Sequence, residues 1–125
     1  MVKTRPSGIE NRPYEVTEDS VIILSNGNPM FFYEGFPTDY ASIPGILKFF
    51  LEWKGDEADA YLVHDHLYNY KGYRVHKGGE IIKVKRRWAD KEMVWHMKRL
   101  GSPAWRRTAY YVAGRLFGWR TYGTI

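Results

Sequence analysis

The stretch from Asp56 to Leu100 decides the fold: DEADAYLVHDHLYNYKGYRVHKGGEIIKVKRRWADKEMVWHMKRL. Its first part predicts a helix from Asp56 to about Asn69, because apolar residues recur near the helical period and acidic residues fill the first turn. Its last part predicts a helix from Lys85 to Leu100, which ends at Gly101, a residue type common after helix C-termini. Between them, Lys77-Gly78-Gly79 is typical of a turn. We therefore expect two antiparallel helices joined by a β-hairpin.

Short β-branched or aromatic runs predict the strands. They lie at residues 14–17, 21–24 and 30–33, and in the hairpin at 73–76 and 80–84. Asn26-Gly27 supplies the backbone freedom that a tight turn needs, so the second and third runs should pair. The N-terminal part is therefore expected to be a small antiparallel β meander.

Two more helices are expected. Gly45 to Trp53 predicts a short one, and Ser102-Pro103 starts a C-terminal one, with Ser as N-cap and Pro in the first turn. The C-terminal helix should run to Gly118 and bury an apolar stripe at helical spacing, made of Trp105, Ala109, Val112, Ala113 and Leu116. The predicted class is α+β, in a single domain spanning residues 1–125.

The composition excludes several classes of protein. The 125 residues are 44% hydrophobic and 17% aromatic, which is unlike a disordered chain. The absence of cysteine excludes a disulfide framework and a thiolate metal site. No apolar run is long enough for a signal peptide or a membrane span, so we expect synthesis in the cytoplasm and no transmembrane segment.

Charge is divided unevenly along the chain. Residues 1–68 hold 5 Lys/Arg and 11 Asp/Glu, whereas residues 69–125 hold 14 and 3. Such asymmetry is typical of a protein that meets nucleic acid, an anionic membrane or an acidic partner. The expected anion-binding or partner-binding residues are Lys98, Arg99, Arg106 and Arg107; a nucleic-acid surface would add Lys83, Lys85, Arg86, Arg87 and Lys91.

His64 and Asp90 are the candidate catalytic pair. His64 shares an otherwise apolar helix face with Tyr68, while His66 points about 200° away, which excludes a His-x-His metal site on a regular helix. Asp90 lies at the edge of the next helix's buried stripe, where a carboxylate needs a partner. With the helices antiparallel, Asp90 can orient His64 as a base toward water.

The remaining candidates surround this pair. Asp65 and Asp39 offer oxygen ligands for a divalent cation. Arg86, which stands unfavourably at a helix start, suggests a carboxylate partner such as Asp90. His76 and His96 are expected at the surface.

Three separated strings carry a resemblance to a known family. They are Gly35-Phe36-Pro37-Thr38-Asp39-Tyr40-Ala41-Ser42-Ile43-Pro44, His64-Asp65-His66-Leu67-Tyr68, and Arg86-Arg87-Trp88-Ala89-Asp90 with Met97. In this order the chain resembles a family of small uncharacterised proteins of tailed bacteriophages and prophages, with Tyr40 where that family usually has Gly. The resemblance implies a phage source and marks Thr38, Ser42 and Tyr68 as supporting residues.

A second resemblance implies a mechanism. His64-Asp65-x-x-Tyr68 on one helix, a hairpin, and Asp90 on the next helix are similar to the catalytic core of phospholipase A2. The resemblance implies His64 as base, Asp65 as calcium ligand, Asp90 as orienting carboxylate and Tyr68 as support. The Gly-rich calcium loop and the disulfides of those enzymes are absent.

Three functions follow as alternatives. The first is a phage hydrolase that acts on a component of the host envelope, associated with the virion or accessory to it. The second is a non-catalytic virion or assembly protein of the tail, neck or baseplate, whose partners are other virion proteins. The third is a nucleic-acid-binding module.

Overall fold

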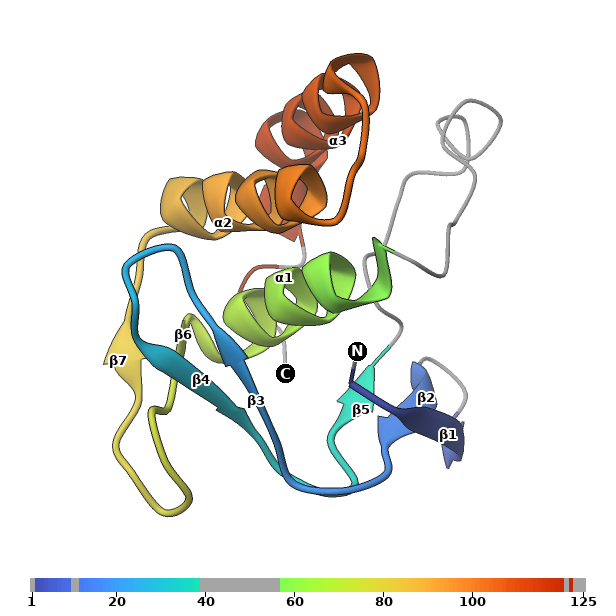
Figure 1. Ribbon diagram of the computed structural model, residues 1–125, viewed down its shortest axis with the longest axis vertical. Coiled ribbons are helices and arrows are strands. Elements are labelled where there is room, and N and C mark those ends of the chain that lie inside the picture. The colour runs from blue at the N-terminus through green and yellow to red at the C-terminus, as the bar shows by residue number, and fades with distance from the viewer. Residues whose placement is uncertain (1, 10–11, 39–56, 121, 123–125) are drawn as a thin grey trace.

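The computed structural model of the protein describes residues 2–9, 12–38, 57–120 and 122 (Figure 1). Five strands come first, and then three helices with two short strands between the first and second. In chain order these are β1 (Thr4–Ile9), β2 (Arg12–Val16), β3 (Ser20–Ile23), β4 (Pro29–Phe32), β5 (Pro37–Thr38), α1 (Ala58–Tyr70), β6 (Gly72–Tyr73), β7 (Ile82–Lys83), α2 (Arg86–Arg99), α3 (Ala104–Phe117) and the 3₁₀ turn η3 (Gly118–Arg120). The predicted α+β class is confirmed.

The strands form three small antiparallel sheets, with orders β1-β2-β5, β3-β4 and β6-β7. The predicted β3–β4 hairpin is present, and Ser20 pairs with Phe32 across it. Strand β1 was not predicted, because its sequence TRPSGI lacks an apolar run. It pairs with β2, which in turn pairs with β5, so β2 and β3 lie in different sheets and the first strands do not form one continuous meander.

Helix α1 is the centre of the molecule. Twelve of its thirteen residues are buried, so it is covered on all sides. Glu57 takes the N-cap position, and Lys71 ends the helix in a left-handed conformation. Asp56, the expected N-cap, lies outside the described residues, as does the short helix expected over residues 45–53.

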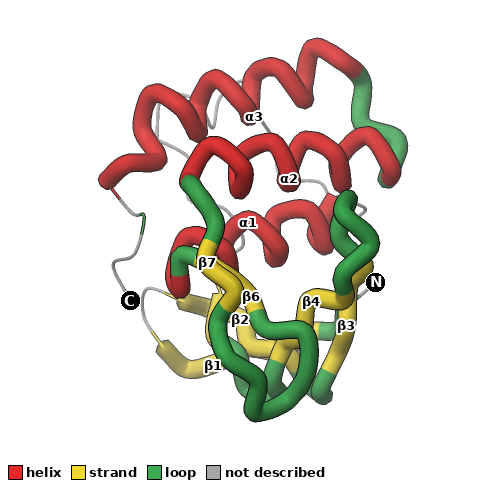
Figure 2. The backbone as a smooth tube through the Cα atoms, turned by 90° about the vertical axis from the view of Figure 1, so that its left-hand side faces the viewer, coloured by secondary structure: helices red, strands yellow, loops and turns green. Residues whose placement is uncertain are grey.

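The three helices stack in chain order, α1 on α2 and α2 on α3, and the strands lie on the α1 side of the stack (Figure 2). Helices α1 and α2 run in opposite directions, as expected (Figure 1). The core consists of apolar side chains from both layers, among them Met30, Phe32, Leu62, Leu67, Ala89, Met93 and Met97. This stacking brings side chains of α1, α2 and α3 to one place.

The predicted buried face of α3 is correct only in part: Ala113 is buried and Ala109 packs against the core, as expected. Trp105, Val112 and Leu116 are exposed, whereas the helix buries Arg106, Tyr110 and Ala113. Helix α3 is rotated so that Arg106 faces inward, because its guanidinium meets a buried carboxylate that is described below. Ser102, predicted to cap α3 with its side chain, instead donates its hydroxyl to Glu57, and Pro103 takes the N-cap position.

Candidate active site

His64 of α1 and Asp90 of α2 are in direct contact. The imidazole Nε2 lies 2.8 Å from Asp90 Oδ1, and the imidazole side chain keeps 10% of its surface exposed while Asp90 keeps none. Because the Nε2 hydrogen is donated to the carboxylate, the lone pair of the neutral ring resides on Nδ1. The pair therefore has the arrangement of a base and its orienting carboxylate.

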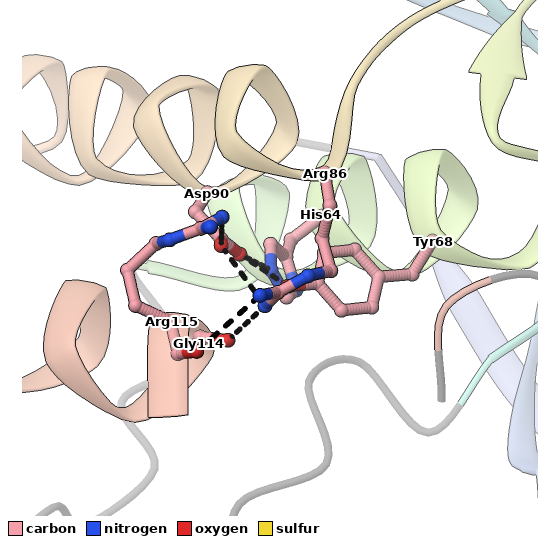
Figure 3. A network of polar contacts seen from close by, with 6 residues as sticks. All are labelled: His64, Tyr68, Arg86, Asp90, Gly114 and Arg115. Carbon is pink, nitrogen blue, oxygen red and sulfur yellow. Dashed lines mark hydrogen bonds and ion pairs between the residues drawn. The ribbon is translucent and has the colours of Figure 1, made fainter. Parts of the chain in front are cut away.

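Asp90 has partners on all three helices (Figure 3). The Tyr68 hydroxyl of α1 donates to its Oδ1 at 2.5 Å, and the Arg115 guanidinium of α3 donates to its Oδ2 at 3.0 Å. Arg86 stands one turn before it on α2, with Nη1 3.7 Å from the same Oδ2. Both carboxylate oxygens are thus held in fixed positions.

These contacts keep Asp90 charged despite its burial. Burial alone acts to raise the pKa of the carboxyl, but the hydrogen bonds from His64 and Tyr68 outweigh it and hold the pKa below its usual value. Burial and the bond to Asp90 raise the pKa of the Tyr68 phenol. Tyr68 is therefore a neutral donor at physiological pH, and its ring packs against His64 with centroids 4.0 Å apart.

Two glycines let α3 approach this network. A Cβ at Gly114 would stand 2.7 Å from Asp90 Oδ1, and one at Gly118 would stand 2.3 Å from the Tyr68 hydroxyl. The Gly114 carbonyl also accepts a 2.6 Å hydrogen bond from Arg86. Backbone at the end of α3 and the start of η3 therefore packs directly against Asp90 and Tyr68.

The second expected group is Asp65, which lies beside His64 in sequence and points elsewhere. Its Oδ2 accepts a 2.5 Å hydrogen bond from the Thr38 hydroxyl of β5, and both side chains are buried. Asp39, the other expected metal ligand, and Ser42, an expected supporting residue, lie outside the described residues. Within the part of the chain that is described, no three His, Asp or Glu side chains lie together as a metal site would require.

His66 lies apart from the site. Its ring packs among Phe32, Phe36 and Tyr70, with centroids about 5 Å away, and its Nδ1 has no hydrogen-bond partner among the described residues. Burial lowers the pKa of His66 to about 4, so the ring is neutral at physiological pH. This agrees with the exclusion of a His-x-His metal site.

The expected anion-binding group of Lys98, Arg99, Arg106 and Arg107 does not form one surface. Arg106 is only 1% exposed, and its Nε donates to Glu57 Oε1 at 2.7 Å, so its charge is neutralised inside the fold. Glu57 also accepts a hydrogen bond from the Tyr61 hydroxyl, and Arg99 bonds His96. The prediction for Arg106 is wrong because the alternative would leave Glu57 buried without a counter-charge.

A further buried network joins α2 to the β3–β4 hairpin. Glu92 accepts hydrogen bonds from the Ser25 backbone N at 2.7 Å and from the Ser25 hydroxyl at 2.5 Å. His96 lies 3.1 Å from the same carboxylate and is completely buried. The expectation that His96 lies at the surface is therefore wrong, because its Glu92 partner one turn earlier is itself buried.

Sequence reasoning missed the contribution of α3 to the site. Neither Arg115 nor Gly114 is assigned to the site from the sequence. A signal was present: Gly114 and Gly118 stand four residues apart, a spacing that puts both on one helix face and allows close approach of another element. That pattern identifies the contacting face of α3 better than its apolar residues do.

A comparison with protein-family models matches residues 14–114 to a family described as "Protein of unknown function (DUF1353)". No curated protein and no solved structure matches the chain significantly. The described residues contain no helix with both the length and the apolar character that crossing a bilayer requires.

Proposed function

The chain belongs to the DUF1353 family of proteins of unknown function, and from its site we propose that it is a hydrolase in which His64 activates water. The observation that carries the proposal is the contact between His64 Nε2 and the buried, charged Asp90. A carboxylate with four partners fixes one imidazole nitrogen and leaves the other to act as a base.

The chemistry follows from this orientation. His64 Nδ1 accepts a proton from water, and the water oxygen attacks the carbonyl carbon of an ester or amide. The imidazolium that forms is stabilised by Asp90, and it returns the proton to the leaving group when the carbon–heteroatom bond breaks. Tyr68 and Arg115 are positioning residues, because they hold Asp90 rather than meeting the substrate.

The second part of the proposal concerns a calcium ion at Asp65. The similarity to phospholipase A2 implies a calcium ion there, which would stabilise developing negative charge on the substrate. One buried carboxylate that also bonds Thr38 provides a single ligand. We propose calcium as an optional component, to be tested together with the activity.

The biological setting is proposed from the resemblance of the three sequence strings to phage and prophage proteins. A small phage hydrolase, carried in the virion or accessory to it, would act on the host envelope. Lipid esters and peptidoglycan amides are both substrates for a water-activating histidine, so both belong in the test.

The experiment measures turnover by the full chain on phosphatidylglycerol–phosphatidylethanolamine vesicles and on purified peptidoglycan, with calcium or with a chelator. We expect His64→Ala to reduce turnover by about 10²-fold or more, which is the usual contribution of a general base. His76→Ala, which changes an exposed loop histidine, is the matched control and should retain activity. Equal turnover by wild type and His64→Ala would exclude the mechanism.

One observation favours a non-catalytic alternative: Asp90 joins α1, α2 and α3, so the same network could serve only to lock the helices. A virion or assembly protein of the tail, neck or baseplate would need such rigidity without any substrate. For that function, wild type shows no turnover on either probe, and light scattering shows oligomers of the purified chain.

A further inference from the structure

A pocket of about 440 Å³ opens at the N-terminal end of α2, next to β6 and β7. Its apolar lining includes Tyr73, Ile82 and Trp88. Four cationic side chains surround this lining: Lys83, Lys85, Arg87 and Lys91. Its size is within the range of small-ligand sites in proteins.

These cations are uncompensated. All four are exposed, and within the described part of the chain none of them forms an ion pair or a hydrogen bond with another side chain. Lys85 and Arg87 also stand at the N-cap and in the first turn of α2, where the helix dipole already presents positive charge. A bound anion would relieve this repulsion. Arg86 differs, because it turns inward to Asp90.

Aromatic rings continue from the pocket along α2. Trp88 is partly exposed and stacks on Tyr73, with the ring planes 15° apart. Trp95 is 41% exposed and follows seven residues later, on the same helix face and about 10 Å farther along the axis. Lys91 and Lys98 are exposed beside these two rings, so aromatic and cationic groups alternate.

We infer that this outer face of α2, with the pocket at its start, binds single-stranded nucleic acid. Bases stack on Trp88 and Trp95, and phosphates lie beside Arg87, Lys91 and Lys98. Stacking suits any base, and a spacing of about 10 Å between the rings lets an extended strand reach both. The inference is independent of hydrolysis at His64. That residue belongs to α1 and contacts Asp90 on the buried side of α2.

The basic residues of the C-terminal half include two groups: arginines paired inside the fold, and exposed cations on the outer face of α2 and on β7. Arg86, Arg106 and Arg115 neutralise carboxylates inside the fold. Those on the outer face of α2 and on β7 are available to an external anion. A single strand fits them better than a flat anionic surface does, because two aromatic rings, Tyr73 and Trp88, lie among the cations.

The test measures fluorescence anisotropy of a labelled 12-nucleotide oligothymidylate with the full chain. We expect Trp95→Ala to weaken binding about tenfold, and Trp95→Phe to restore most of it, because one base loses and then regains its stacking partner. Trp105→Ala, which removes an even more exposed ring on α3, is the control and should leave affinity unchanged.

The charges are tested through salt. Arg87→Ala and Lys91→Ala should each lower the magnitude of the slope of log affinity against log salt by about 0.7, and Lys77→Ala on the distant loop should not. Any of three results would overturn the inference. The first is an equal loss of oligothymidylate affinity in Trp95→Ala and Trp105→Ala. The second is an affinity for inorganic polyphosphate or duplex DNA equal to that for the single strand. The third is competition by free thymidine monophosphate with the same affinity as the strand.

Discussion

Asp90 is completely buried and still charged, because hydrogen-bond donors from α1 and α3 and the nearby Arg86 guanidinium of α2 replace the water it has lost. The pair with His64 could be predicted from helix periodicity together with the antiparallel arrangement that the intervening hairpin implies. The Arg115 contact could not, because it depends on how α3 rotates. Sequence reasoning therefore reached the two central residues and missed the side chain that completes their charge balance.

At this scale we predict that Gly114→Ala destabilises the protein. Alanine normally favours a helix over glycine, but the added Cβ would stand 2.7 Å from a carboxylate that is fixed on both oxygens. The expected loss is about 1–3 kcal/mol, which is typical of overpacking, measured by urea unfolding. Thr108→Ala, at an exposed position of the same helix, is the control and should be neutral or stabilising. A gain in stability for Gly114→Ala would contradict the close approach.

Among the elements, α1, α2 and the β3–β4 hairpin were predictable, because each carries its own local signal in apolar spacing or turn residues. The buried face of α3 was not. Its apolar residues recur at helical spacing, yet burial of Arg106 against Glu57 decides the rotation. Strand β1 was also unpredictable, because its pairing with β2 comes from the backbone rather than from apolar side chains.

The rotation of α3 predicts different costs for two leucine substitutions. Leu116 is 60% exposed, so Leu116→Ala should cost less than about 1 kcal/mol, which is typical of surface changes. Leu67 on α1 is fully buried, and Leu67→Ala should cost about 2–5 kcal/mol because it leaves a cavity. Urea unfolding of the two variants compares them directly, and equal costs would place α3 in the orientation that its apolar residues suggest.

Over the whole molecule, part of the charge asymmetry cancels between the two halves of the chain. Glu57 pairs with Arg106 and Asp19 pairs with Lys77, each joining an acidic residue of the first half to a basic residue of the second. Asp90 is an exception, because its arginines come from its own half. Four basic residues of the second half, Lys83, Lys85, Arg87 and Lys91, remain exposed around the pocket beside α2.

Burial of His66 makes the stability of the whole protein depend on pH. Its pKa is about 4 in the folded state and 6.5 in a model peptide, so the unfolded chain binds the extra proton between these values. Folding stability should therefore fall by about 3 kcal/mol as pH decreases from 6.5 to 4. Below that range, the lowered pKa values of Asp90, Glu57 and Glu92 extend the loss.

Urea unfolding at several pH values checks this dependence. His66→Leu removes the titrating ring and keeps an apolar side chain among Phe32, Phe36 and Tyr70. The variant should lose clearly less stability than wild type between pH 6.5 and 4. A variant with the same slope as wild type would assign the acid sensitivity to other groups.

The arrangement of Gly114 and Arg115 against Asp90 also has a consequence for biosynthesis. His64 and Asp90 emerge from the ribosome before α3 does, so the nascent α1–α2 pair at first lacks the guanidinium and the backbone that cover the carboxylate. The geometry of the candidate site is therefore completed only after α3 has been translated. Until α3 has docked, His64 and Asp90 remain open to water.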